Sequence, residues 1–86
     1  MKRINFERIE IFEDIEHTRC RVCNVKKDFA NAIYQNGLGI ESHALALKIY
    51  NSSGEAEFSE PEVELIKKYA AQCQPAFYDA IIKITK

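Results

Sequence analysis

Cys20 and Cys23 form a Cys-x-x-Cys motif, the pattern in this chain that is most suggestive of chemistry. Together with His17, His43 and Cys73, the motif raises two kinds of site, a zinc centre and a redox pair of thiols. We expect neither. Residues three apart on an extended strand project to opposite faces, so the two thiols cannot share an ion there, and redox pairs usually open a helix. We interpret the cysteines as small, buried and reduced side chains, with no metal and no cofactor.

The span 51–60 has the make-up of a calcium-binding loop, because polar residues and Gly54 precede a glutamate at the start of a predicted helix. If Gly54 held the sixth position of an EF-hand loop, however, the first ligand position would fall on Ile49, whose side chain has no oxygen. We therefore expect no calcium site and interpret the span as a solvated turn before a capped helix.

His17 and His43 are the side chains best suited to acid–base catalysis near neutral pH. No serine or thiol can be placed beside either histidine from the sequence, and the chain has no glycine-rich phosphate loop. A chain of 86 residues also has little room for a pocket of the usual few hundred cubic ångströms. We expect no enzymatic activity, and we interpret His43 as a half-buried side chain near the start of a helix.

A modest basic stretch, made by Arg19, Arg21, Lys26 and Lys27, is the main feature that favours nucleic-acid binding. A helix-turn-helix reader over residues 29–50 is disfavoured, because its second helix offers alanine and leucine where a recognition helix presents polar and basic side chains. The formal net charge is -1, and proteins that bind nucleic acids usually carry a basic excess. A nucleic-acid-binding regulator that uses this basic face of a hairpin is our alternative hypothesis.

The composition, 47% hydrophobic and 29% charged, is typical of an ordinary soluble globular protein. No apolar run near the start suits a signal peptide, and no stretch approaches the ~18 apolar residues of a membrane span. We expect a cytoplasmic protein with a single domain over residues 1–86, no membrane partner and no small-molecule substrate. Its size and make-up resemble those of short accessory proteins carried by bacteria and their phages, although no motif identifies a family.

Residues 40–50 (IESHALALKIY) are apolar almost all the way around a helix. A helix on a protein surface shows a single apolar stripe, whereas one that is apolar on every side is typical of an interior. We expect the other elements to surround this helix, unless a second copy of the chain covers part of it.

The patterns around this helix predict an α+β fold, in which an N-terminal β-hairpin packs on a bundle of about four short α-helices. Alternating residues predict the hairpin over about 4–25, and a bulge near Glu7 or a division into two segments reconciles the phases of its first strand. Residues 55–58 can add a very short extended piece. Periodicity predicts helices at about 27–36, 40–51, 60–73 and 76–84.

The start of the third helix carries the most specific local signal in the chain. Ser59 and Glu62 are spaced as a capping box, and Pro61 suits the first turn, where a missing amide hydrogen is harmless. Phe58 and Val63 occupy the two positions of a hydrophobic staple. We also expect Gly37 to end the first helix in the left-handed conformation, and Cys73 to lie on the buried face of the third.

The last helix is expected to bury one side, made by Phe77, Ala80, Ile81 and Ile84. Tyr78 and Ile82 lie on its flank and leave apolar surface that this small chain does not easily cover. The outer edge of the hairpin can also pair with the same edge of a second copy. We expect a homodimer with Tyr78 and Ile82 at an interface. Its expected function is that of a small non-enzymatic accessory protein acting through protein–protein interaction or self-association.

Overall fold

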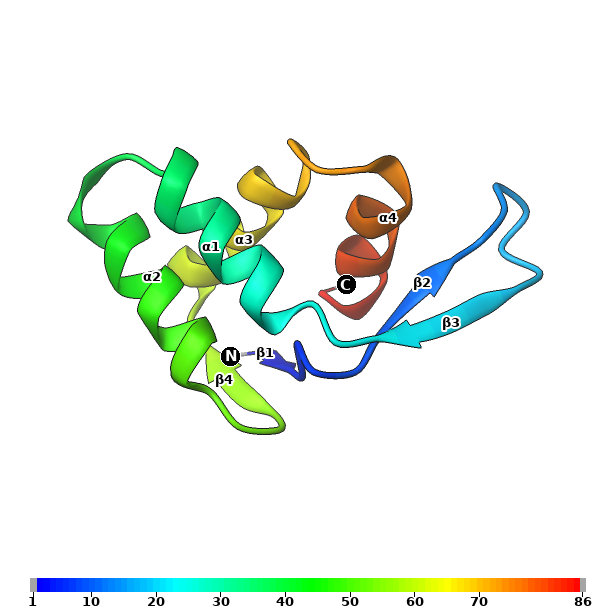
Figure 1. The fold of residues 1–86 in the computed structure, drawn as a ribbon, viewed down its shortest axis with the longest axis horizontal. Helices are drawn as coiled ribbons and strands as arrows, with labels where there is room; N and C mark the ends of the chain where they lie inside the picture. Colours follow the sequence, from blue (N-terminus) through cyan, green and yellow to red (C-terminus); the bar gives the residue numbers. More distant parts are fainter. Residues whose placement is uncertain (1, 86) are drawn as a thin grey trace.

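The structure, a computed structural model, describes residues 2–85 of the chain. Along these residues the elements are β1 (Lys2–Ile4), β2 (Ile9–Phe12), β3 (Cys20–Cys23), α1 (Lys26–Asn36), α2 (Gly39–Asn51), β4 (Ala56–Phe58), α3 (Glu60–Ala70) and α4 (Pro75–Ile84), as Figure 1 shows. The predicted α+β fold, with an N-terminal hairpin and about four helices, is confirmed.

The strands form two separate antiparallel pairs instead of one sheet. β2 pairs with β3, which confirms the predicted hairpin, and β1 pairs with β4, about fifty residues further along the chain. Arg3 stands opposite Glu57 in the second pair, and their side chains form an ion pair at 3.2 Å. The first predicted strand divides in two because the chain turns between β1 and β2, where the amide of Glu7 donates to Asn5 Oδ1 at 3.0 Å.

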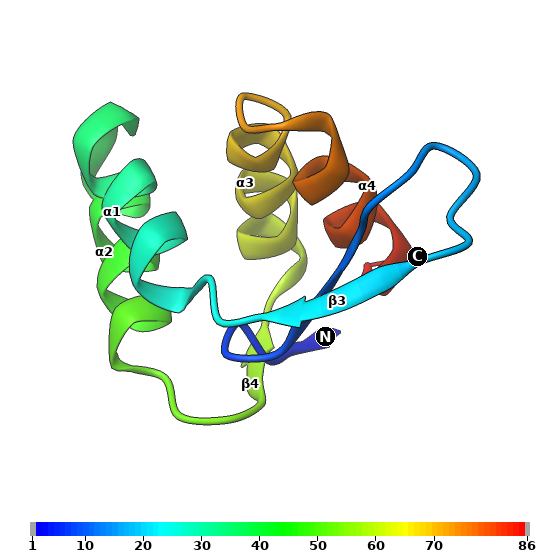
Figure 2. The same cartoon turned by 45° about the vertical axis from the view of Figure 1, so that its right-hand side comes forward.

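The helices α1 and α2 pack together at one end of the molecule, and the β2–β3 hairpin projects at the other end (Figures 1 and 2). α3 and α4 lie between these ends, and α4 packs against β2. Phe6, in the turn after β1, lies at the centre of the core. Its ring stacks on Phe29 at 5.4 Å between centroids and meets Phe58 edge-on at 5.7 Å, so it joins the turn to α1 and β4.

α3 begins as the sequence predicts. The amide of Glu62 donates to Ser59 Oγ at 3.4 Å, and the amide of Ser59 donates to Glu62 Oε1 at 2.8 Å, so the capping box is confirmed. Pro61 lies in the first turn. Phe58 and Val63 are both buried at the two positions of the predicted staple.

The end of α3 is corrected by the structure. The helix ends at Ala70 instead of about Cys73, because the amides of Gln72 and Cys73 bond carbonyls three residues back and tighten the last turn. Cys73 is therefore half-buried beside the turn and does not continue the buried face. Pro75 lies within the first turn of α4, where its ring is compatible with the helix.

The predicted buried side of α4 is wrong at its last position. Phe77, Ala80 and Ile81 are buried, but Ile84 is more than a third exposed. Thr85, four residues after Ile81, is buried in its place, and its hydroxyl donates to the Ile81 carbonyl at 2.7 Å.

Gly37 does not end α1 in the left-handed conformation, because its φ of -74° and ψ of 154° are those of extended backbone. The left-handed glycine of the link is Gly39, with φ of 86°. Gly37 is required for space instead: a Cβ there would lie 2.5 Å from the carbonyl oxygen of Ile33 and 2.8 Å from Ser42 Cβ. The absence of a side chain allows α2 to turn back tightly against α1.

Candidate functional site

Exposed apolar side chains gather on one surface of the molecule. Among residues 2–85, eight large apolar side chains are exposed, and five of them lie on α1, α2 and the link between these helices. The five are Tyr34, Leu38, Ile40, Leu47 and Tyr50, and we call the surface that they form the α1–α2 face. Leu38 and Ile40 are 86% and 83% exposed. Single exposed apolar residues are common on soluble proteins, whereas large contiguous apolar patches are often interaction sites.

α2 is open along one side, so the expectation that the rest of the chain surrounds it is wrong, and the alternative that a second copy covers part of it stays a prediction. Its inner side is buried by Ser42, Leu45, Ala46 and Ile49. On its outer side Ala44 and Leu47 are exposed, because α2 lies at the end of the molecule and its main packing partner is α1 (Figure 1). His43 is likewise exposed instead of half-buried. Residues 2–85 leave this side of α2 uncovered.

A buried hydroxyl pair fixes the end of the face where α1 and α2 join. Tyr69 of α3 reaches the link, with its hydroxyl 2.5 Å from Ser42 Oγ and accepting a hydrogen bond from the Leu38 amide at 3.3 Å. Both hydroxyls are buried and satisfied, an arrangement that specifies one backbone geometry. The link is therefore held with Leu38 and Ile40 turned outward. In the sequence, Ser42 is the residue that could have indicated this buried contact, because it places a hydroxyl on the inner side of an apolar helix.

The middle of the face is a shallow groove between α1 and α2, with a volume of about 290 Å³. It is lined by Ala30, Asn31, Tyr34, His43, Ala46, Leu47 and Tyr50. The rings of Tyr34 and His43 lie 5.7 Å apart between centroids. No carboxylate or ammonium group lines the groove among the described residues. Two tyrosines beside aliphatic carbon suit contact with another protein, because each presents a dry ring and a hydroxyl that can stay wet.

Lys26 is part of a structural brace, which removes it from the predicted basic face. Its Nζ lies 3.3 Å from Glu7 Oε2 and donates to the Ser52 carbonyl at 3.0 Å. Glu7 Oε1 accepts the Gly54 amide at 2.7 Å, and this bond, with the neighbouring Lys26, holds the pKa of Glu7 below its ordinary value. The Lys26 side chain is only 18% exposed. The brace fixes the loop after α2.

The remaining basic residues, Arg19, Arg21 and Lys27, are exposed on or near β3.

The interpretation of the motif cysteines as buried is wrong for Cys20, which is exposed, while Cys23 is half-buried. The helix α4 packs on β2 and leaves β3 at the outside of the hairpin. Burial raises the pKa of the Cys73 thiol. In the described part of the chain, no group of three or more potential metal ligands lies close enough to hold an ion.

His17 lies against α4, at the base of a hollow of about 420 Å³. Its ring stacks on Phe12 with 3.8 Å between centroids, and its Nε2 lies 3.6 Å from Asp79 Oδ2. Both Ile82 and Tyr78 are half-buried. Ile82 lines the same hollow, and Tyr78 packs against the core. Within residues 2–85, no hydroxyl or thiol nucleophile lines this hollow. The role of Tyr78 and Ile82 at an interface stays a prediction, and both lie apart from the α1–α2 face.

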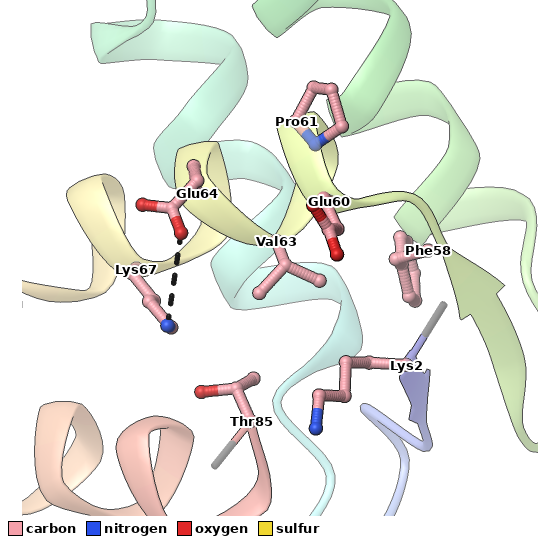
Figure 3. Close-up of a pocket in the computed structure, with 8 residues that line it drawn as sticks. All are labelled: Lys2, Phe58, Glu60, Pro61, Val63, Glu64, Lys67 and Thr85. Atoms are coloured by element: carbon pink, nitrogen blue, oxygen red, sulfur yellow. Dashed lines mark ion pairs between the residues drawn. The ribbon is translucent and has the colours of Figure 1, made fainter.

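A third hollow, of about 570 Å³, lies between β1, the start of α3 and the end of α4 (Figure 3). The acids Glu60 and Glu64 and the amines of Lys2 and Lys67 line it, so opposite charges balance, and Lys67 Nζ lies 3.9 Å from Glu64 Oε1. The Thr85 hydroxyl on its wall is engaged by the carbonyl groups of α4. Among the described residues no histidine lines the hollow. Its side chains favour neither an anion nor a cation.

Along residues 2–85, no helix has the length and apolar character required to cross a lipid bilayer. No protein-family model, curated protein or solved structure is similar enough to this chain to place it in a family.

Proposed function

We propose that this chain is a small non-enzymatic protein that acts by binding another protein chain, including a copy of itself, through the α1–α2 face. The observation that supports the proposal is the concentration of exposed apolar side chains on α1, α2 and their link, with Tyr34, Leu47 and Tyr50 around one groove. Among the described residues no carboxylate or ammonium group lines the groove at the centre of the face, and interface cores are typically depleted of charge and enriched in aromatic residues.

Site-specific photo-crosslinking tests this proposal. A photoreactive phenylalanine analogue at position 34 is expected to give covalent adducts with protein in cells that express the chain, because Tyr34 borders the groove. The same analogue in place of Lys68, which is exposed on α3, supplies the background. A third variant at Tyr78 tests the interface predicted from α4. Adducts at position 34 that do not exceed those at position 68 would contradict the proposal.

The alternative, a nucleic-acid-binding regulator, now depends on Arg19, Arg21 and Lys27, because Lys26 is held in the brace. Phosphate contacts make such binding weaken steeply as salt rises. A mobility-shift assay with random-sequence DNA and RNA separates the two functions, and no shift at low salt removes the alternative.

A further inference from the structure

We propose that the open side of α2 binds the same side of α2 in a second copy of this chain, with the two helices antiparallel across a two-fold axis. This inference rests on the proposed function and identifies the partner. It takes up the alternative that a second copy covers part of the helix over residues 40–50, in place of the dimers expected through the hairpin edge or the flank of α4.

The open side of α2 has the residue spacing of a helix–helix seam. Ile40, Ala44, Leu47 and Asn51 are exposed and follow one another at intervals of four, three and four residues. This is the spacing with which two helices pack side by side, because it keeps one row of side chains facing the partner over successive turns. The buried residues of α2 lie on the opposite side of the helix.

An antiparallel arrangement makes this seam fit itself. A two-fold axis between Ala44 and Leu47 sets each alanine against a leucine of the other copy, so a small side chain meets a large one. The same register places Ile40 level with Asn51, whose polar amide lies at the open end of the seam, and uses all four seam positions. Because the axis is two-fold, each of these contacts is formed twice.

The charges beside the seam complement one another in the antiparallel arrangement. Glu41 and Lys48 border the seam on the same side, two turns apart, or about 10.5 Å along the helix. Antiparallel packing keeps this flank of both copies on the same side of the seam and brings Glu41 of each copy near Lys48 of the other, whereas parallel packing about a two-fold axis would place the two flanks on opposite sides of the seam. Lys48 already binds Glu62 Oε1 at 2.9 Å, yet its side chain is 40% exposed and can accept a second carboxylate.

The area of the α1–α2 face matches what a dimer requires. With ~200 Å² for a tyrosine and ~100 Å² for the apolar part of a leucine or isoleucine, the exposed fractions of its five residues amount to ~400 Å². A stable interface takes ~800 Å² from each partner, of which ~57% is apolar. The face thus holds most of the apolar surface of one standard interface, of which Ile40 and Leu47 on the seam supply ~130 Å² and Tyr34, Leu38 and Tyr50 beside it the rest.

The edge of β3 is a weaker site for a second copy. In the alternating pattern of an antiparallel pair, the backbone groups of Cys20 and Val22 point away from β2 and toward this edge. Two-fold pairing centred on Cys20 or Arg21, however, places arginine side chains opposite one another. A short edge strand with exposed arginines is typical of edges that are protected against pairing.

Sedimentation velocity on the full chain tests the inference. We expect a dimer at micromolar concentration that Leu47→Glu weakens at least tenfold, because it places two carboxylates at the centre of the seam. The matched control is Val22→Glu, which changes a side chain of similar exposure on the hairpin, 51% against 44%, and is expected to leave the dimer intact. Circular dichroism confirms that each variant is folded.

A second pair of variants tests the orientation of the helices. Glu41→Lys is expected to weaken the dimer severalfold at low salt, and Glu16→Lys, an equivalent change on the hairpin turn, is not. A wild-type chain that stays monomeric at about 1 mM overturns the inference, as does a dimer that is insensitive to Leu47→Glu. A response to Leu47→Glu without a response to Glu41→Lys overturns the antiparallel arrangement. If the chain is monomeric yet position 34 crosslinks to another protein, the proposed function survives and only the dimer is refuted.

Discussion

The substitution Gly37→Ala tests the packing of the link on which the α1–α2 face depends. At most positions with ordinary backbone angles, replacing glycine by alanine stabilises a protein by about 0.4–1 kcal/mol, because it restricts the unfolded chain. Gly37 has such angles, with φ of -74° and ψ of 154°. If backbone conformation were all that mattered, Gly37→Ala would raise the stability.

The surroundings of Gly37 reverse this sign. The added Cβ would lie 2.5 Å from the Ile33 carbonyl oxygen, a backbone atom that also accepts the Gly37 amide at 2.7 Å. It would lie 2.8 Å from Ser42 Cβ and 3.2 Å from the Tyr69 hydroxyl, so the link has to move away from its hydrogen bond to Tyr69. Overpacking costs about 1–3 kcal/mol and a weakened hydrogen bond about 0.5–1.5 kcal/mol. After the unfolded-state gain, we expect a net loss of about 2 kcal/mol.

Urea denaturation followed by circular dichroism measures this change in the free energy of unfolding. A loss of about 2 kcal/mol corresponds to a fall of about 8–16 °C in the melting temperature for a domain of this size. Gly54→Ala is the control for backbone strain alone, because Gly54 has φ of 66° and nothing within 4 Å of an added Cβ. A Gly37→Ala variant as stable as the wild type would refute the account of close packing at the link.

Two further predictions concern the contacts that hold α2 in place. We expect each of the variants Tyr69→Phe and Ser42→Ala to lower the free energy of unfolding in urea by about 1–3 kcal/mol, because each leaves a buried hydroxyl or amide without its partner. The double variant should lose less than the sum of the two single losses, and strictly additive losses would contradict the pairing of the two hydroxyls. Glu7→Gln is expected to destabilise the chain at neutral pH and much less at about pH 3. The Gly54 amide and Lys26 lower the pKa of Glu7 in the folded state, so its contribution is present above the unfolded pKa and is lost as the pH falls below about 5 through the lowered value. The exposed Glu55→Gln is the control, and a difference for Glu7→Gln that does not change with pH would contradict the brace.

The features that the sequence predicts correctly are those determined within a few residues. The capping box of Ser59 and Glu62 forms as expected, because each partner lies within three positions of the other. The β2–β3 hairpin also follows from local alternation and a short polar turn. The weaker possibility of an extended piece at residues 55–58 is realised as β4.

The features that sequence reasoning missed depend on contacts between distant residues. β4 pairs with β1, which no local pattern indicates. The predicted hairpin over about 4–25 includes Phe6, yet Phe6 lies in a turn, and its ring contacts Phe29 of α1 and Phe58 of β4. The predicted basic face includes Lys26, and its role in the brace depends on the approach of Glu7 and the loop after α2. The contact of Gly37 with Ser42 likewise arises only once α2 folds back.

The largest error of the sequence reasoning concerns α2, and its cause also supports the proposed dimer. Apolar residues on every side of a helix indicate that the helix is covered, but they do not distinguish cover by the same chain from cover by a second chain. A chain of 86 residues buries a smaller share of its surface than a larger domain does. The elements that pack on α2 cover one side of the helix and leave Ile40 and Leu47 exposed. If Leu47→Glu separates the two copies while Val22→Glu does not, the cover of α2 comes from a second copy, the alternative that the sequence leaves open. If neither variant has an effect, the outer side of α2 does not form a dimer, and the proposal that a second copy covers it is wrong.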